Sequence, residues 1–324
     1  MADLNTFSTA QVPPQFLKSA FLVGKIPFRT CRSHPSVCYT LYIPPHAYNP
    51  DPSRTTDGNP AYSLPCLPLI VSIHGTGRNA ENCRDRLIDF ADKEHVAVLA
   101  PLFPAGSDGP SGLDGYKVLR AKGLNSDLVL LDILDEIEAV WPGISTQKIF
   151  LTGFSGGGQF ALRFLYIHPQ RVKAVSIGAP GRATLLSDQE WPRGVGNIES
   201  IFGAGTMVDI EKIQVIPIQL NVGSEDNYIH GGDDFWAFVQ EMKANLRKSG
   251  AIDPQAHQDP GLETMKEGRL DALTRLRDSW ESHGIHAALD IVPGIAHESI
   301  KALPMVLEFL QPQIEGFGRA AALS

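Results

Sequence analysis

The sequence predicts an α/β fold, a three-layer α/β/α sandwich around a mostly parallel sheet of about eight strands. Short apolar segments alternate with amphipathic segments along most of the 324 residues, which is the pattern of repeated βαβ units. A glycine-rich turn at residues 153–157 also joins an apolar segment directly to a helical one. We expect a single domain over residues 1–324, because α/β folds of this length often form one unit.

Eight segments fit β-strands because they are short, apolar and rich in β-branched residues. The first two, Ala20–Ile26 and Val37–Ile43, precede the alternating part of the chain and are expected to form an antiparallel edge. Leu67–Ile73 is a continuous apolar run, which suits a strand buried on both faces. The others are predicted at Val96–Ala100, Lys148–Leu151, Val172–Ile177, Val215–Val222 and Ala287–Val292.

Helical periodicity is clearest at Asp127–Val140, where Trp141-Pro142-Gly143 ends the helix. Residues 181–212 hold many glycines and have no clear period, so we expect an inserted lid or cap there. A plain surface connection is the alternative. Further helices are predicted at Asn82–Lys93, Gly157–Ile167, Phe235–Lys248, Leu273–His283 and Ile300–Leu310.

A Gly-x-Ser-x-Gly pentapeptide, Gly153-Phe154-Ser155-Gly156-Gly157, lies between a predicted strand and a predicted helix. A serine on such a sharp turn is exposed as a nucleophile. The strained turn needs neighbours that lack side chains, which explains the glycines at 153 and 157. The backbone N–H of Gly156, at the helix N-terminus, can stabilise developing negative charge. We therefore predict Ser155 as the nucleophile and Gly156 as one oxyanion donor.

Four features follow one another along the chain: the His74-Gly75-Thr76 turn, the Ser155 turn, the Gly223-x-x-Asp226 turn and His297. In this combination the chain resembles the α/β-hydrolase superfamily over roughly residues 67–310, and most closely its esterase and polyester-depolymerase-like branch. The resemblance implies the α/β-hydrolase fold, a Ser–acid–His triad in that chain order, and no cofactor or metal. It also implies that the N–H of Thr76, or alternatively of Gly77, is the second oxyanion donor.

The same turn allows a different interpretation. Gly75-x-Gly77-x-x-Ala80 follows a strand and precedes a helix, as a dinucleotide-binding fingerprint does, and Glu94 is available as its acidic residue. We prefer the hydrolase interpretation because it also accounts for the downstream features. His74 is then expected to be a structural hydrogen-bonding residue.

The general base is predicted to be His297, because it follows the last strand and catalytic groups lie at the carboxyl ends of parallel strands. His168 ends the nucleophile helix, and His283 and His286 precede the last strand, at its wrong end. The acid is expected after the strand at Val215–Val222, where Asp226 matches the family's acid turn; Glu225 is the main alternative, and Asp233 and Asp234 are weaker ones.

Composition excludes several classes of partner. The net charge of −8 disfavours nucleic-acid binding, because no basic surplus exists to neutralise phosphates. No apolar run approaches the roughly 20 residues that span a bilayer, and residues 1–16 lack the pattern of a secretion signal. We therefore expect a cytoplasmic protein, and the sequence allows a homodimer. No CxxC spacing indicates a zinc site, and we expect reduced thiols at Cys31, Cys38, Cys66 and Cys83.

These features predict a serine hydrolase that cleaves a carboxylic ester or lactone of a small hydrophobic molecule through an acyl-enzyme on Ser155. The alternatives are an acyltransferase, a carbon–carbon bond hydrolase, a serine peptidase or amidase, and a catalytically silent ligand-binding protein on the same fold. The loop Phe103–Tyr116 is expected to line the pocket. Apolar residues of the candidate lid can also form its wall: Trp191, Pro192, Ile198, Ile201, Phe202, Met207 and Val208.

Overall fold

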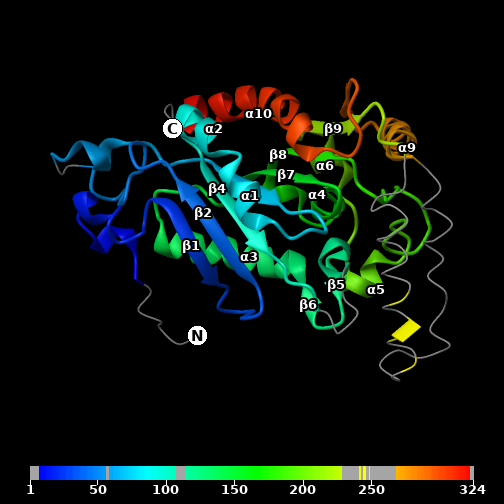
Figure 1. Ribbon diagram of the computed structural model, residues 1–324, viewed down its shortest axis with the longest axis horizontal. Coiled ribbons are helices and arrows are strands. Elements are labelled where there is room, and N and C mark those ends of the chain that lie inside the picture. The colour runs from blue at the N-terminus through cyan, green and yellow to red at the C-terminus, as the bar shows by residue number, and fades with distance from the viewer. Residues whose placement is uncertain are drawn as a thin grey trace.

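A computed structural model of the chain describes residues 7–55, 58–106, 114–227 and 268–321, together with Glu241, Ala244, Asn245 and Lys248. Its centre is an eight-stranded sheet with the order β1-β2-β4-β3-β7-β8-β9-β10 (Figure 1). The strands from β4 to β10 run parallel, whereas β1 and β2 are antiparallel at one edge. The predicted mostly parallel sheet with an antiparallel edge is confirmed.

The strands agree closely with the apolar segments of the sequence, apart from their ends. Gly153 and Phe154, which precede the nucleophile, belong to β7. The strands are β1 Gly24–Thr30, β2 Cys38–Ile43, β3 Leu69–Ile73, β4 Ala97–Leu102, β7 Ile149–Phe154, β8 Val172–Gly178, β9 Ile218–Gly223 and β10 Ala288–Val292. A separate small ribbon pairs β5 Arg120–Ala121 with β6 Leu124–Asn125.

The helices follow the strands in alternation. They are α1 Ala80–Asp85, α2 Ile88–Glu94, α3 Ser126–Val140, α4 Gly156–Ile167, α5 Ile198–Phe202, α6 Ile210–Gln214, α9 Arg269–Glu281 and α10 Ser299–Ala321. Short 3₁₀ turns occur at Thr9–Gln11, Pro14–Phe16, Pro60–Ser63, Gly115–Val118 and Pro169–Arg171. The predicted helix Phe235–Lys248 lies outside the described residues, apart from the four residues named above.

Several predicted boundaries are wrong, and the largest error is in the last helix, which continues to Ala321 rather than ending at Leu310. The first strand begins at Gly24 rather than Ala20, because Phe21 has a positive φ of 54° that extended backbone does not adopt. The predicted helix Asn82–Lys93 is two helices, since the chain turns at Leu87 to bury that side chain. Residues 215–217, which the sequence predicts as strand, form the turn between α6 and β9.

The sheet is buried on both faces because successive side chains of a strand point to opposite sides. In β3, Leu69 and Val71 belong to the core packed against α3 and α4, while Ile70 belongs to the core packed against α2 and α10. Figure 1 shows α2 and α10 along one side of the sheet and α3 along the other. In the part of the chain that the structure describes, no helix has the length and apolar character needed to span a membrane.

Candidate active site

Ser155 occupies a tight turn between the end of β7 and the start of α4. Its backbone has φ 57° and ψ −115°, a combination that is unfavourable for any residue with a side chain. The surrounding structure holds it there: the Ser155 N–H donates to the Gly178 carbonyl at 2.8 Å, and the Ser155 carbonyl accepts from the Gln159 N–H at 3.0 Å. The strained serine turn predicted from the sequence is therefore present.

Close backbone packing explains the glycines around Ser155. A Cβ atom on Gly153 would lie 2.3 Å from the Gly157 carbonyl oxygen, and one on Gly157 would lie 2.1 Å from the Ile73 carbonyl oxygen. Gly158 is equally constrained, because its Cβ would lie 2.3 Å from the Gly178 carbonyl oxygen. Helix α4 thus approaches β3 and β8 more closely than any side chain allows.

Asp226 and His297 lie together at the carboxyl ends of the neighbouring parallel strands β9 and β10. His297 Nδ1 is 2.7 Å from Asp226 Oδ2, and the Asp226 side chain is buried. The two loops touch directly, since a Cβ on Gly223 would lie 2.2 Å from the Ile295 carbonyl oxygen. Glu225, the alternative acid, is exposed, and its backbone N–H donates to the Ile295 carbonyl. Asp233 and Asp234 lie outside the described residues.

A second charged group holds the same carboxylate. Arg269, at the start of α9, donates from Nη1 to Asp226 Oδ1 at 3.0 Å, and its backbone N–H donates to the Asp226 carbonyl at 3.0 Å. Arg269 is buried, and this desolvation lowers the pKa of its guanidinium, while the charge of Asp226 opposes that shift. Sequence reasoning missed Arg269 because no local motif marks it.

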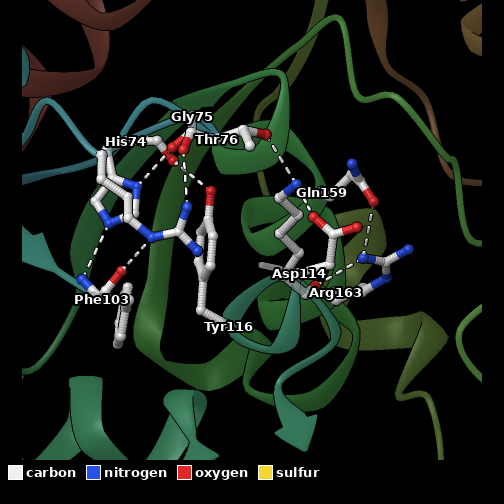
Figure 2. Close-up of polar contacts among 10 residues, drawn as sticks. His74, Gly75, Thr76, Phe103, Asp114, Tyr116, Gln159 and Arg163 are labelled. Atoms are coloured by element: carbon white, nitrogen blue, oxygen red, sulfur yellow. Dashed lines mark hydrogen bonds and ion pairs between the residues drawn. The ribbon is translucent and has the colours of Figure 1, made fainter. Parts of the chain in front are cut away.

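The two expected oxyanion donors are neighbours. A Cβ on Gly156 would lie 3.3 Å from the Thr76 backbone nitrogen, and Thr76 lines the cavity beside Ser155. The Thr76 side chain is fixed by a hydrogen bond, because Lys117 Nζ donates to Thr76 Oγ1 at 2.9 Å. Lys117 also forms an ion pair with Asp114 (Figure 2). Burial lowers the pKa of Lys117, while Asp114 opposes this shift.

His74 is a structural residue of the turn that carries Thr76, as the sequence predicts. Its Nδ1–H donates to the Gly75 carbonyl at 2.8 Å and its Nε2 accepts from the Phe103 N–H at 3.0 Å, while the Tyr116 hydroxyl donates to its carbonyl (Figure 2). Burial lowers the pKa of His74 to about 4. Gly75 faces Ser155, since its Cβ would lie 3.8 Å from the Ser155 Cβ, so this turn packs against the nucleophile turn.

Ser155 and His297 line one cavity of about 240 Å³. Thr76 and Gly77 border it on one side, and the first two turns of α10 border it on the other. Residues 181–212 do not line it, and neither do the described residues of the loop Phe103–Tyr116. The full lining is Ser72, Ile73, Gly75, Thr76, Gly77, Asn79, Cys83, Arg86, Leu87, Thr152, Gly153, Phe154, Ser155, Asn221, His297, Ser299, Ala302, Leu303 and Val306.

Four of the seven candidate lid residues pack onto the body of the protein, whereas Met207 is exposed. The Trp191 indole N–H donates to the Val118 carbonyl at 2.8 Å, and its ring meets Phe202 edge to face at 5.0 Å between centroids. Ile198 is buried, and Val208 packs against the main core. Whether residues 181–212 act as a lid stays a prediction.

Other residues singled out in the sequence lie away from the cavity or form part of its wall. His168 Nε2 is 2.9 Å from Asp127 Oδ2, on the far end of α4. All four cysteines are free, and Cys83 lines the cavity. In the described residues, no three side chains of the metal-binding types come close enough together to hold an ion.

Comparison with known proteins supports this architecture. No protein-family model matches the chain. An uncharacterized carboxylesterase of Bacillus subtilis (strain 168) is 23% identical over 255 residues, which is 76% of this chain and 75% of that protein.

Solved structures resemble the chain more completely. A poly(3-hydroxybutyrate) depolymerase from Bordetella parapertussis is 21% identical with a TM-score of 0.61, covering 92% of this chain and 94% of its own. The poly(aspartic acid) hydrolase-1 of Sphingomonas sp. KT-1 is 18% identical with a TM-score of 0.58, covering 84% and 92%. Together with the sheet order and the serine turn, these likenesses establish that the chain has the α/β-hydrolase fold.

Proposed function

We propose that the protein is a serine hydrolase that cleaves a carboxylic ester or lactone through an acyl-enzyme on Ser155. One observation carries the proposal: His297 is hydrogen-bonded to the buried Asp226 and shares a cavity with Ser155, which is held on a strained turn. The similarity to a carboxylesterase and to a depolymerase of a polyester supports ester bonds as the target.

In the proposed mechanism, Asp226 accepts the Nδ1–H of His297 and so leaves Nε2 as the base. Nε2 takes the proton of Ser155 while Oγ attacks the ester carbonyl. The N–H groups of Gly156 and Thr76 stabilise the resulting oxyanion. His297 then returns the proton to the leaving alcohol, and a water molecule, activated by the same imidazole, releases the acid and regenerates Ser155.

The test uses 4-nitrophenyl esters of increasing acyl length with the wild type and Ser155→Ala. Loss of the nucleophile is expected to lower kcat by about three orders of magnitude or more. Ser200→Ala, an exposed serine on α5, is the matched control and should keep wild-type activity. A fluorophosphonate should add its mass to the wild type but not to Ser155→Ala.

The outcomes separate the alternatives. Turnover that survives in Ser155→Ala would disprove the nucleophile. Labelling of Ser155 without turnover of any ester would favour an amidase, an acyltransferase or a carbon–carbon bond hydrolase. A wild type that neither turns over nor reacts with the fluorophosphonate would indicate a ligand-binding protein on this fold.

A further inference from the structure

The cavity beside Ser155 carries a positive charge that the proposed mechanism does not use. Among the described residues that line the cavity, Arg86 and His297 are the only basic side chains. No aspartate or glutamate is among them. The chain as a whole has a net charge of −8. The charge of the cavity wall is therefore opposite in sign to the net charge of the chain.

Arg86 contacts no carboxylate of the residues that the structure describes. Its Nη1 donates to Ser299 Oγ at 3.1 Å, and it forms no ion pair with any described residue. The acids closest to it and to Ser299 in sequence already have partners: Asp85 accepts from Lys25 and Arg84, and Glu298 pairs with Lys301. A guanidinium has five N–H donors, and this arrangement commits one of them to Ser299.

The rest of the wall is suited to a short hydrocarbon segment. Leu87 of the α1–α2 turn and three residues of α10, Ala302, Leu303 and Val306, line the same cavity. The volume of about 240 Å³ limits the occupant to a small group. Such a wall contacts methylene groups, while Arg86 offers a site for a planar anion.

We propose that Arg86 is a substrate-binding residue and that the preferred substrates are small esters that carry a carboxylate separated from the ester carbonyl or oxygen by a short hydrocarbon segment. This inference rests on the proposed function and narrows its substrate class. The hydrocarbon segment contacts Leu87, Leu303 and Val306, and the carboxylate pairs with the Arg86 guanidinium. Ester cleavage itself proceeds on Ser155 as described above, with Arg86 taking no part in proton transfer.

The experiment compares matched esters that differ in one charge. Mono-4-nitrophenyl adipate is paired with 4-nitrophenyl hexanoate, which places the carboxylate on the acyl side. For the alcohol side, 4-carboxyphenyl hexanoate is paired with phenyl hexanoate. The measured quantity is the ratio of kcat/KM for the charged ester to kcat/KM for the neutral one, after subtraction of spontaneous hydrolysis. The wild type should favour the charged ester in at least one pair.

Arg86→Gln should lower this ratio by about tenfold or more, because a hydrogen bond between two charged groups is lost. Arg86→Lys keeps the charge and should retain part of the preference. Lys301→Gln removes an exposed positive charge from α10 without touching the cavity, and its ratio should match the wild type. Ser299→Ala removes the contact that ties Arg86 to α10 and should keep the preference for the charged ester.

The outcomes distinguish a failure of the proposed function from a failure of the substrate inference. If no ester in either pair is cleaved, the proposed function fails. If neutral esters are cleaved but the wild type shows no preference for charge in either pair, the substrate inference is wrong while the function stands. If Arg86→Gln and Ser299→Ala lower kcat/KM equally for charged and neutral esters, Arg86 is only a structural link between the α1–α2 turn and α10.

Discussion

At the scale of single residues, the Asp226 carboxylate is divided between two partners. Oδ2 faces His297 Nδ1 and Oδ1 faces the guanidinium of Arg269. The hydrogen bond from Arg269 holds the carboxylate in position, and the carboxylate in turn fixes the orientation of the His297 imidazole.

Arg269→Met should therefore lower kcat/KM for 4-nitrophenyl esters by about tenfold or more, because the buried Asp226 carboxylate loses a hydrogen bond from a charged group and no longer holds the His297 imidazole in one orientation. Arg269→Lys should restore part of the activity, and Arg275→Met, an exposed arginine on the same helix, is the control. Wild-type kcat/KM in Arg269→Met would show that Asp226 keeps its position without Arg269.

At the scale of elements, the position of Ser155 depends on how closely α4 approaches the sheet. The first turn of α4 contains Gly156, Gly157 and Gly158, and each packs against backbone or side-chain atoms from another element. Glycine weakens a helix interior by about 1 kcal/mol relative to alanine. The three glycines therefore lower the intrinsic stability of helix α4, but they allow it to approach the sheet this closely.

Gly157→Ala should destabilise the protein by about 2–3 kcal/mol, because its Cβ would meet the Ile73 carbonyl oxygen and push α4 off β3. Gly316→Ala in α10 is the opposite case. A Cβ at Gly316 would have no atom within 4 Å, and the backbone there is helical, so the substitution should stabilise by about 0.5–1 kcal/mol. Urea unfolding followed by circular dichroism measures both. Equal effects at the two glycines would refute the packing argument.

At the scale of the whole molecule, buried neutral His74 links folding to pH. Its pKa falls from 6.5 in an exposed chain to about 4 in the fold, so the unfolded chain binds one more proton between these values. Stability is therefore complete above about pH 6.5 and is lost as the pH falls toward 4. The full loss amounts to about 3 kcal/mol.

The free energy of unfolding, measured in urea between pH 7 and pH 4.5, should fall more steeply for the wild type than for His74→Gln. Glutamine does not titrate. Its side-chain oxygen can accept the hydrogen bond that the Phe103 N–H donates to His74 Nε2 in the wild type. Unfolding of the variant should therefore take up about one proton fewer than unfolding of the wild type in this pH range. Parallel pH curves for the two proteins would mean that His74 titrates normally.

Most of the sheet could be predicted from the sequence, because hydrophobic periodicity is local and depends on few neighbours. All eight strands were expected, and their errors lie at the ends, where a single turn such as Phe21 decides the boundary. The strand, turn and helix around Ser155 were predictable for the same reason: the glycines that permit the strained turn lie within three residues of it.

The remaining features of the site depend on contacts between distant segments. Asp226 and Glu225 are adjacent in sequence, and only the packing of the β9 and β10 loops turns one inward and leaves the other exposed. Arg269 reaches Asp226 across 43 residues, and Arg86 reaches Ser299 across 213. Local patterns carry no information on such pairs, because the geometry that brings them together exists only once the sheet has ordered its strands.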